Sequence, residues 1–406
     1  MPDFENEVFC IVVVAIYIHL FFYMKVAYIS YPAFADCDVP LLHSLQNKVD
    51  ITYILCVSKG SCNQTLLNIS RNDVKSGIHP AGTTKGLEQI GAYFDINKVY
   101  ICWESTNNRL GLFQNCLKLC FFLKKCKFDI VHITWPLSYT SFPLYIFKGK
   151  MILTVHDPLP HSSNINRMSQ MYRKVAFKLV GSFIILNKTQ KEDFIQTYNL
   201  YKKKIFTSRL SIYYHLSNVD AKRSDRKDYV LFFGQISAYK GLDVLCESMR
   251  LVRRIIPSAK LLVAGRGDIY FNINEYVDDG TIDFFNYYIP NEELAGLIKN
   301  ASFVVCPYLD ATQSGVIMSS FSLNIPVVVT SVGGLPEMVG YGKYGMVIPP
   351  EDPRVLSESI VHLLKNPNLL KEYKDNIQND FFKGEKSWDN IAEEIGSIYN
   401  QCCNAQ

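Results

Sequence analysis

The sequence lacks a strong excess of charge of either sign. Its 42 lysine and arginine residues against 38 acidic residues leave a formal charge of +4. A charge this small does not indicate a nucleic-acid partner, although it is compatible with a basic face near a membrane. We therefore expect no nucleic-acid binding and keep a membrane surface as a candidate partner.

The sequence also lacks any Cys-x-x-Cys pair, although it contains 12 cysteines. The Cys402–Cys403 doublet has no partner histidines nearby, which argues against a zinc site. Cys56, Cys102 and Cys306 lie in apolar segments typical of strands. We expect reduced core cysteines, a reducing compartment and no bound metal.

The first 23 residues lack the basic start and the cleavage site of a secretory signal peptide. Val8–Tyr23 is an apolar run interrupted only by His19, and it is short for a membrane span. Three readings stay open: a short membrane anchor, a core helix, or upstream sequence before a true start at Met24. We favour the last, because Met24–Ile29 looks like the opening strand of a Rossmann-type domain.

A chain of 406 residues is too long for one compact core and suits two domains. Strand-like and helix-like segments alternate from Met24 onward, which predicts a doubly wound α/β domain over residues 24–216. Its expected strands are Lys25–Ser30, Ile51–Val57, Val99–Trp103, Ile130–Thr134, Met151–His156, Phe183–Leu186 and Ile205–Arg209.

A charged, apolar-poor run over residues 217–228 predicts a linker to a second α/β domain over 229–386. In the last segment, 387–406, the apolar spacing of Ser387–Tyr399 predicts an amphipathic helix with Ser387 as its N-cap. The expected strands of the second domain are Tyr229–Phe233, Lys260–Ala264, Ile282–Phe285, Phe303–Cys306 and Val327–Thr330.

Small polar residues follow two of these strands and lead into helices. Thr312, Gln313, Ser314 and Gly315 come after Phe303–Cys306, and Gly333-Gly334 comes after the next strand. Free backbone N–H groups and the helix dipole favour an anion at such helix starts. The sequence therefore predicts a phosphate site at this edge of the sheet.

A lysine loop follows the strand Tyr229–Phe233, in the sequence GQISAYKG over Gly234–Gly241. Lys240 could neutralise a diphosphate, and Gly241 would let the backbone approach it closely. Taken alone, Lys240 reads as a solvated lysine at a helix start. Two loops at the ends of strands in one sheet favour the functional reading, because both would face one crevice.

Six other features have weaker readings. His156 at a strand end is about as easily structural as functional, His132 inside a strand reads as a core residue, and His161 ranks lower. The glycines of Gly265-Arg266-Gly267 indicate a tight turn rather than a dinucleotide fingerprint. Asp310 reads as a loop cap, and Glu337 as a favourable charge at a helix N-terminus.

Several segments of the second half, taken in order, resemble the family 4 glycosyltransferases. They are the lysine loop, LLVAGRGD, NYYIPNEEL, PYLDATQSGV, IPVVVTSVGGLPE and the closing Trp-bearing helix. The resemblance covers Tyr229–Tyr399 and is looser before it. It implies a GT-B fold, with two Rossmann-like doubly wound parallel-sheet domains facing each other across a cleft. The second would bind a nucleotide diphospho-sugar, the first the acceptor, and the closing helix would pack back on the first. Family members retain anomeric configuration and need no bound metal or other cofactor.

The resemblance assigns roles residue by residue. The catalytic residues would be His156 and Lys240. The donor-binding residues would be Gly234, Gln235, Lys240, Gly241, Tyr288, Thr312, Gln313, Ser314, Gly315 and Ser319, followed by Asp157, Asp310, Gly334 and Glu337.

The sequence departs from the family pattern at four places. Ala311 and Ser319 stand where many members carry two glutamates, and Gln235 stands where an arginine is common. The glycine-rich loop after the first strand is replaced by Tyr31–Phe34. The branch with an Ala-Thr-Gln-Ser-Gly-Val loop is the nearest pattern.

We therefore expect a cytoplasmic retaining hexosyltransferase, at the inner face of a membrane, in cell-surface polysaccharide synthesis. It would move a sugar to a glycan or lipid-linked acceptor. The alternatives are a catalytically silent nucleotide-sugar-binding scaffold and a GT-B nucleotide-sugar epimerase. The sequence does not indicate which sugar, base or acceptor is used.

Overall fold

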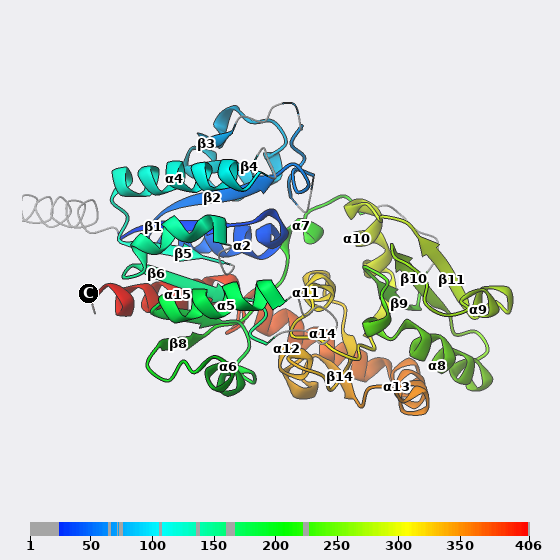
Figure 1. Cartoon of the computed structure of the whole chain (residues 1–406). Coiled ribbons are helices and arrows are strands. Elements are labelled where there is room, and N and C mark those ends of the chain that lie inside the picture. The colour runs from blue at the N-terminus through cyan, green and yellow to red at the C-terminus, as the bar shows by residue number, and fades with distance from the viewer. Residues whose placement is uncertain are drawn as a thin grey trace, which may run out of the picture. The chain divides into compact units, whose positions relative to one another are not determined.

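The computed structural model describes residues 24–404, apart from 64–65, 71, 73–75, 105–107, 135–138, 160–166 and 222–226. The apolar stretch 1–23, His161 and residues 222–226 of the expected linker therefore lie outside the described residues. Strands and helices alternate along the chain (Figure 1). Contacts divide it into two compact units, one of 1–153, 179–182 and 392–406, the other of 154–178 and 183–391.

Eight strands of the described chain form a first sheet in the order β3-β4-β2-β1-β5-β6-β7-β8. β1 pairs in parallel with β2 and β5, as do β2 with β4 and β5 with β6. The short edge strand β3 runs antiparallel to β4, so the expectation of a purely parallel sheet is corrected at one edge. The strands are β1 Lys25–Ser30, β2 Asp50–Ser58, β3 Gly77–Pro80, β4 Val99–Glu104, β5 Ile130–Ile133, β6 Met151–Val155, β7 Ser182–Ile185 and β8 Lys204–Thr207.

The helices between these strands differ widely in length. Figure 1 shows the longest, α4, running along the outside of the first sheet. The helices are α2 Ala35–Leu45, α3 Glu88–Gly91, α4 Arg109–Cys126, the 3-10 helix η4 Tyr139–Phe147, α5 Arg167–Leu179, α6 Lys191–Tyr198 and α7 Tyr214–Ser217.

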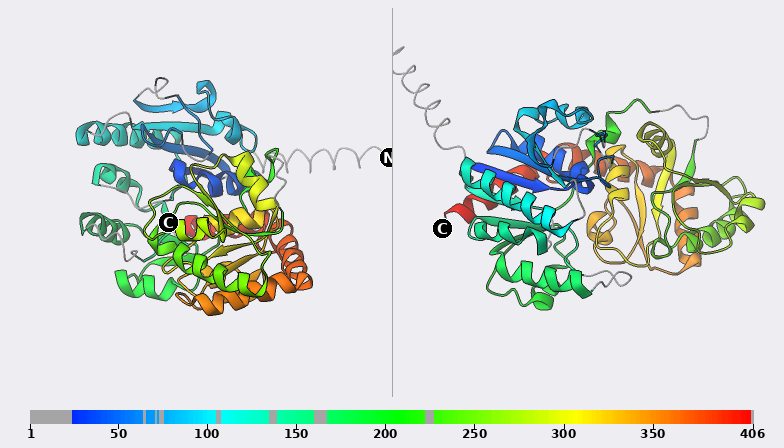
Figure 2. Two further views of the ribbon diagram at one scale, coloured as in Figure 1. Left: turned by 90° about the vertical axis from the view of Figure 1, so that its right-hand side faces the viewer. Right: turned by 45° about the horizontal axis from the view of Figure 1, so that its top comes forward.

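A second sheet of six strands has the order β11-β10-β9-β12-β13-β14, and every pairing in it is parallel. Its strands are β9 Tyr229–Phe233, β10 Leu261–Gly265, β11 Ile282–Asn286, β12 Ala301–Cys306, β13 Val327–Thr330 and β14 Gly345–Ile348. Its helices are α8 Leu242–Ile255, α9 Asn274–Asp278, α10 Asn291–Lys299, α11 Gly315–Ser322, α12 Leu335–Met338, α13 Pro353–Lys365 and α14 Pro367–Phe382. Figure 2 shows these helices, coloured green to orange, on both sides of the sheet.

Three strands of the second sheet, β9, β10 and β13, are buried along their whole length. Such continuous apolar runs are typical of parallel strands packed between helices, as the sequence predicted. The prediction of two Rossmann-like doubly wound α/β domains is confirmed.

The closing helix α15, Trp388–Cys403, buries its apolar positions Trp388, Ile391, Ile395 and Ile398, as expected. The Ser387 hydroxyl accepts a hydrogen bond from Asn390 N–H at 3.4 Å, which confirms it as the N-cap.

His132 of β5 is a core residue, as its place within a strand suggested. It is 1% exposed, and its Nδ1 atom lies 2.6 Å from the Tyr399 hydroxyl of α15. The cysteines of the described chain are free thiols, and Cys56, Cys102 and Cys306 are buried in strands. None of the described helices has the length and apolarity needed to cross a membrane.

Candidate functional site

The winding of the second sheet reverses between β9 and β12. From β9 the chain proceeds through β10 to β11 on one side, while β12, β13 and β14 follow on the other side. β9 and β12 pair directly and in parallel, so their carboxyl ends meet at one edge. Open α/β sheets bind ligands at such a switch point. The lysine loop after β9 and the polar loop after β12 are therefore neighbours.

The two loops are held against each other through their backbones. Leu309 N–H donates a hydrogen bond to the Tyr239 carbonyl at 2.7 Å. Gly241 has a φ of +64°, and a Cβ at this position would lie 2.1 Å from the Pro307 carbonyl oxygen. Glycine at 241 is thus required by the backbone conformation and by the close approach of the other loop.

Lys240 is a buried cation at this edge, with 8% of its surface exposed. Its Nζ atom lies 5.4 Å from the centre of the buried Tyr308 ring, and the Ser314 hydroxyl donates a hydrogen bond to Tyr308 Oη at 3.4 Å. Burial lowers the pKa of the Lys240 ammonium, with the nearby Cys306 opposing this shift. An anion bound beside Nζ would stabilise the charged form. The alternative prediction for Lys240, a solvated lysine at a helix start, does not fit, because a solvated lysine would be exposed. The burial of Lys240 therefore supports its prediction as a site residue.

The amino end of helix α11 lies in the same place. The helix begins at Gly315, and its N-cap Ser314 makes no side-chain hydrogen bond to the first turn. A Cβ on Gly234 would lie 3.4 Å from Val316 Cγ2 and 3.5 Å from Lys240 Nζ. The helix start, the lysine and the glycine after β9 therefore converge, and together they offer an anion backbone N–H groups, a helix dipole and an ammonium group.

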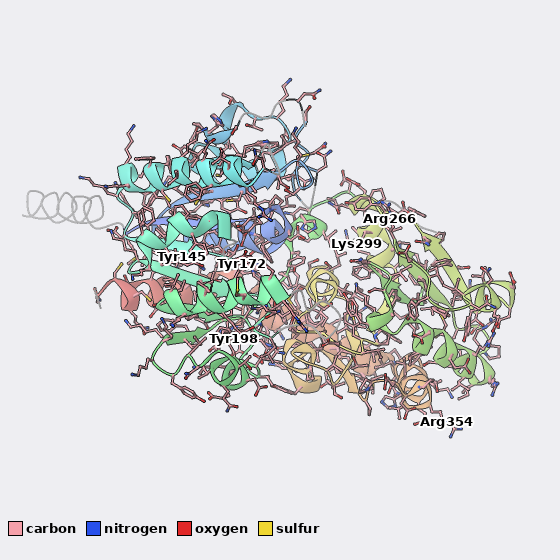
Figure 3. All side chains as sticks on the ribbon, viewed as in Figure 1. Tyr145, Tyr172, Tyr198, Arg266, Lys299 and Arg354 are labelled. Atoms are coloured by element: carbon pink, nitrogen blue, oxygen red, sulfur yellow. The ribbon has the colours of Figure 1, made fainter. Side chains whose placement is uncertain are left out.

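A pocket of about 860 Å³ adjoins this point, at the ends of β9 and β10. Its lining includes Gly234, Gln235 and the strongly exposed Tyr288, all of them predicted donor-binding residues. Arg266, labelled in Figure 3, and Tyr287 also line it. Neither was a predicted donor-binding residue, although both follow strand ends.

The Gly265-Arg266-Gly267 segment is not a tight turn, so this expectation is wrong. Gly265 ends β10, and Gly267 forms a parallel bridge with Ile236. A Cβ at Gly265 would lie 1.8 Å from the Gly234 carbonyl oxygen. These glycines allow the end of β10 to approach the lysine loop closely, which shapes the floor of the pocket.

His156 follows β6 and belongs to the same compact unit as the loops described above. It is 8% exposed, and burial lowers its pKa to about 4, with Asp157 opposing this shift. The imidazole is therefore neutral at pH 7. Asp157 accepts a hydrogen bond from the Thr312 hydroxyl, which ties the His156 segment to the polar loop after β12.

A third segment, residues 186–189 after β7, contacts four of the predicted donor-binding residues. These are Thr312, Gln313, Gly334 and Glu337. Gln313 Nε2 donates to the Leu186 carbonyl at 3.0 Å, and Asn187 Nδ2 donates to the Thr312 carbonyl at 3.4 Å. Gly334 packs against the Asn187 amide, where a Cβ would clash.

Glu337 fixes the same segment from its other side. It accepts hydrogen bonds from the backbone N–H groups of Lys188 at 2.9 Å and Thr189 at 2.8 Å. Glu337 also lies in the first turn of α12, as predicted, so these hydrogen bonds add a second role to the expected charge at a helix N-terminus. Sequence analysis missed residues 187–189, although their place directly after a strand was a usable signal.

The positions that lack the family's glutamates carry no charge. Ala311 and Ser319 are 4% and 8% exposed, and Ser319 lies within α11. Asp310 is half-buried in the loop before Ala311. Among the described residues, no group of three or more histidine, cysteine, aspartate or glutamate side chains could hold a metal ion.

Residues 227–366 match the family model described as glycosyl transferases group 1. An uncharacterized glycosyltransferase of Methanocaldococcus jannaschii is 28% identical over 183 residues, which cover 43% of this chain and 45% of the relative. The match spans less than half the length of this relative. The segment that matches the family model contains both loops of the candidate site.

Two solved structures share the fold across nearly the whole chain. A glycosyltransferase from Rickettsia africae has a TM-score of 0.64 at 14% identity, with 95% of this chain and 100% of that chain covered. The Anabaena protein HepE in complex with UDP has a TM-score of 0.61 at 14% identity, with 93% and 100% covered. At this level of identity the likeness establishes the fold.

Proposed function

We propose that the protein is a glycosyltransferase that takes its sugar from a nucleotide diphospho-sugar bound at the carboxyl edge of the second sheet. The observation that carries the proposal is the convergence of buried Lys240 with the start of α11 at the switch point. The adjoining pocket of about 860 Å³ is large enough for a nucleoside. The group 1 domain match and the UDP bound to HepE support the same assignment.

In the proposed reaction, the bond between the anomeric carbon and the β-phosphate oxygen breaks, and an acceptor hydroxyl oxygen forms the new bond. The charge that develops on the departing phosphate would be stabilised by Lys240 and the N–H groups at the start of α11. The acceptor proton would pass to that phosphate, and no protein nucleophile is required. We also propose that the reaction retains the anomeric configuration and needs neither a metal nor another cofactor. Thr312 and Ser314 would contact the donor.

His156 would position the donor sugar rather than neutralise charge. Its pKa of about 4 keeps the imidazole neutral at pH 7, so it can form hydrogen bonds without adding a cation. Asp157 and Thr312 hold this segment against the donor loop. We assign His156 to the reacting side of the sugar.

The acceptor would be a glycan or lipid-linked saccharide, and the process cell-surface polysaccharide synthesis on the cytoplasmic side of a membrane. A second candidate function is a silent nucleotide-sugar scaffold. It is favoured by the uncharged residues Ala311 and Ser319 at the two glutamate positions.

Turnover of a panel of nucleotide diphospho-sugars tests the proposal, with release of nucleoside diphosphate as the readout. We expect release from at least one donor and a fall of about 100-fold or more in Lys240→Met. Lys386→Met is the matched control, because burial also lowers the pKa of Lys386 while its ammonium lies over the Tyr344 ring, outside the site. Tight binding of a donor with neither hydrolysis nor transfer would establish the scaffold instead.

A further inference from the structure

Helix α4 carries one buried and one exposed set of apolar side chains, on adjoining arcs of its surface. Cys116, Leu119, Cys120 and Leu123 are buried on its inner face. On its outer face Leu110, Phe113, Leu117 and Phe121 are 62%, 40%, 36% and 73% exposed. At 100° per residue these four side chains fall within an arc of about 80°. A surface helix normally turns polar residues outward, so the packing of α4 on the sheet does not account for this stripe.

The neighbouring 3-10 helix η4 extends the exposed apolar surface. It packs against α4, and its Phe142 and Ile146 are 39% and 67% exposed. Leu144 and Tyr145, the latter labelled in Figure 3, are buried and anchor η4. We call the six exposed side chains the α4–η4 face: Leu110, Phe113, Leu117, Phe121, Phe142 and Ile146. Several exposed apolar side chains on two elements that pack together are typical of an interaction site.

The charged residues of the two helices that carry the α4–η4 face are all basic. The sequence of α4 contains Arg109, Lys118, Lys124 and Lys125 and no acidic residue. Lys124 falls within the same arc as the apolar stripe, and Lys118 and Lys125 border it. Lys148 follows η4 and is exposed, as are the four basic residues of α4. Apolar side chains flanked by lysines match an anionic bilayer. The apolar side chains can enter the boundary between headgroups and acyl chains, and the lysines can contact the lipid phosphates.

Other occupants fit this surface less well. Lysine is depleted in protein interfaces, because burying an ammonium against another protein is costly. A second copy of this chain would bring the same lysines together without any acidic partner on α4. A lipid surface instead lets long lysine side chains keep their charges at the headgroup level while apolar neighbours enter.

We propose that the α4–η4 face docks the protein peripherally on an anionic lipid bilayer. This role goes beyond the transfer reaction and does not depend on it. The apolar side chains insert at the headgroup boundary, and the lysines contact lipid phosphates. All six side chains lie within the first compact unit, so the docking surface is separate from the residues proposed to hold the donor.

Vesicle flotation of the full chain tests this assignment. The probes are vesicles of phosphatidylcholine alone and of phosphatidylcholine with an equal part of phosphatidylglycerol. We expect binding to the anionic vesicles, weakened by salt, and a loss of about tenfold or more in partitioning for Leu117→Ser/Phe121→Ser. Lys118→Glu/Lys124→Glu/Lys125→Glu should lose the preference for anionic vesicles.

Controls separate the face from other parts of the chain. Ile255→Ser removes a side chain of α8 that is 56% exposed and should bind like the unchanged protein. All variants keep residues 1–23, so equal binding by the double variant would assign membrane binding elsewhere and overturn the proposal. Absence of binding by the unchanged protein would overturn it too. A dimer that becomes monomeric in the double variant would show that a second copy covers the face.

Discussion

At the scale of single residues, Lys240 shows how sequence and structure contribute differently. Its place after β9 was readable from the sequence, as was the glycine after it. Its burial was not readable, because Tyr308, whose ring lies near Nζ, comes from the loop after β12, which is distant in the sequence. The same holds for Glu337, whose hydrogen bonds go to residues almost 150 positions away. Nonlocal partners of this kind leave no periodic signal in the sequence.

His156 gives a prediction about pH at the same scale. Its folded pKa of about 4 lies below the value of about 6.5 for an unfolded chain, so the unfolded state takes up a proton first as pH falls from 6.5 to 4. Stability is therefore lost with falling pH in this window. From pH 7 to pH 5 the share of His156 in the loss is about 2 kcal/mol. Urea unfolding at pH 7 and pH 5 should show that His156→Gln loses about 2 kcal/mol less stability between these pH values than the unchanged protein does.

The control for this prediction is His362→Gln, since His362 is an exposed residue of α13 in the same unit. Its loss of stability between pH 7 and pH 5 should equal that of the unchanged protein. An unchanged loss in His156→Gln would mean that His156 is accessible to protons in the folded state, against the burial described above.

At the scale of elements, the sequence was most reliable where strands are mostly apolar and buried. β1, β9 and β13 have the bounds that the sequence predicted. β3 and β14 were missed, because each is short and only partly buried and begins with glycine. The Gly265–Gly267 segment was misread because glycine serves turns and close backbone approaches equally well.

Gly241 carries a prediction about the contact between the two donor loops. Gly241→Ala should lower the free energy of unfolding by more than about 2 kcal/mol, because the new Cβ meets the Pro307 carbonyl and the backbone is left-handed. Gly280→Ala is the matched control, with a φ of +69° and only Arg253 Nη1 at 4.0 Å. It should cost about 1 kcal/mol. Equal losses in chemical denaturation would show that the loops do not constrain each other.

At the scale of the whole molecule, the two-sheet α/β architecture followed from length and from the alternation of apolar runs. The proposed donor site was readable because its residues lie at strand ends, where the loops converge by topology. The first sheet offered no comparable motif, so the acceptor stays unspecified. The outer stripe of α4 was not singled out either, because only the fold distinguishes its buried from its exposed apolar side chains.

The central claim is that a nucleoside diphosphate binds at the carboxyl edge of the second sheet through Lys240. Isothermal titration of the chain with a panel of nucleoside diphosphates tests it most directly. We expect one of them to bind, Lys240→Met to weaken that binding by about tenfold or more, and Lys386→Met to leave it unchanged. Equal affinities of the three proteins, or no binding by the unchanged chain, would contradict the account.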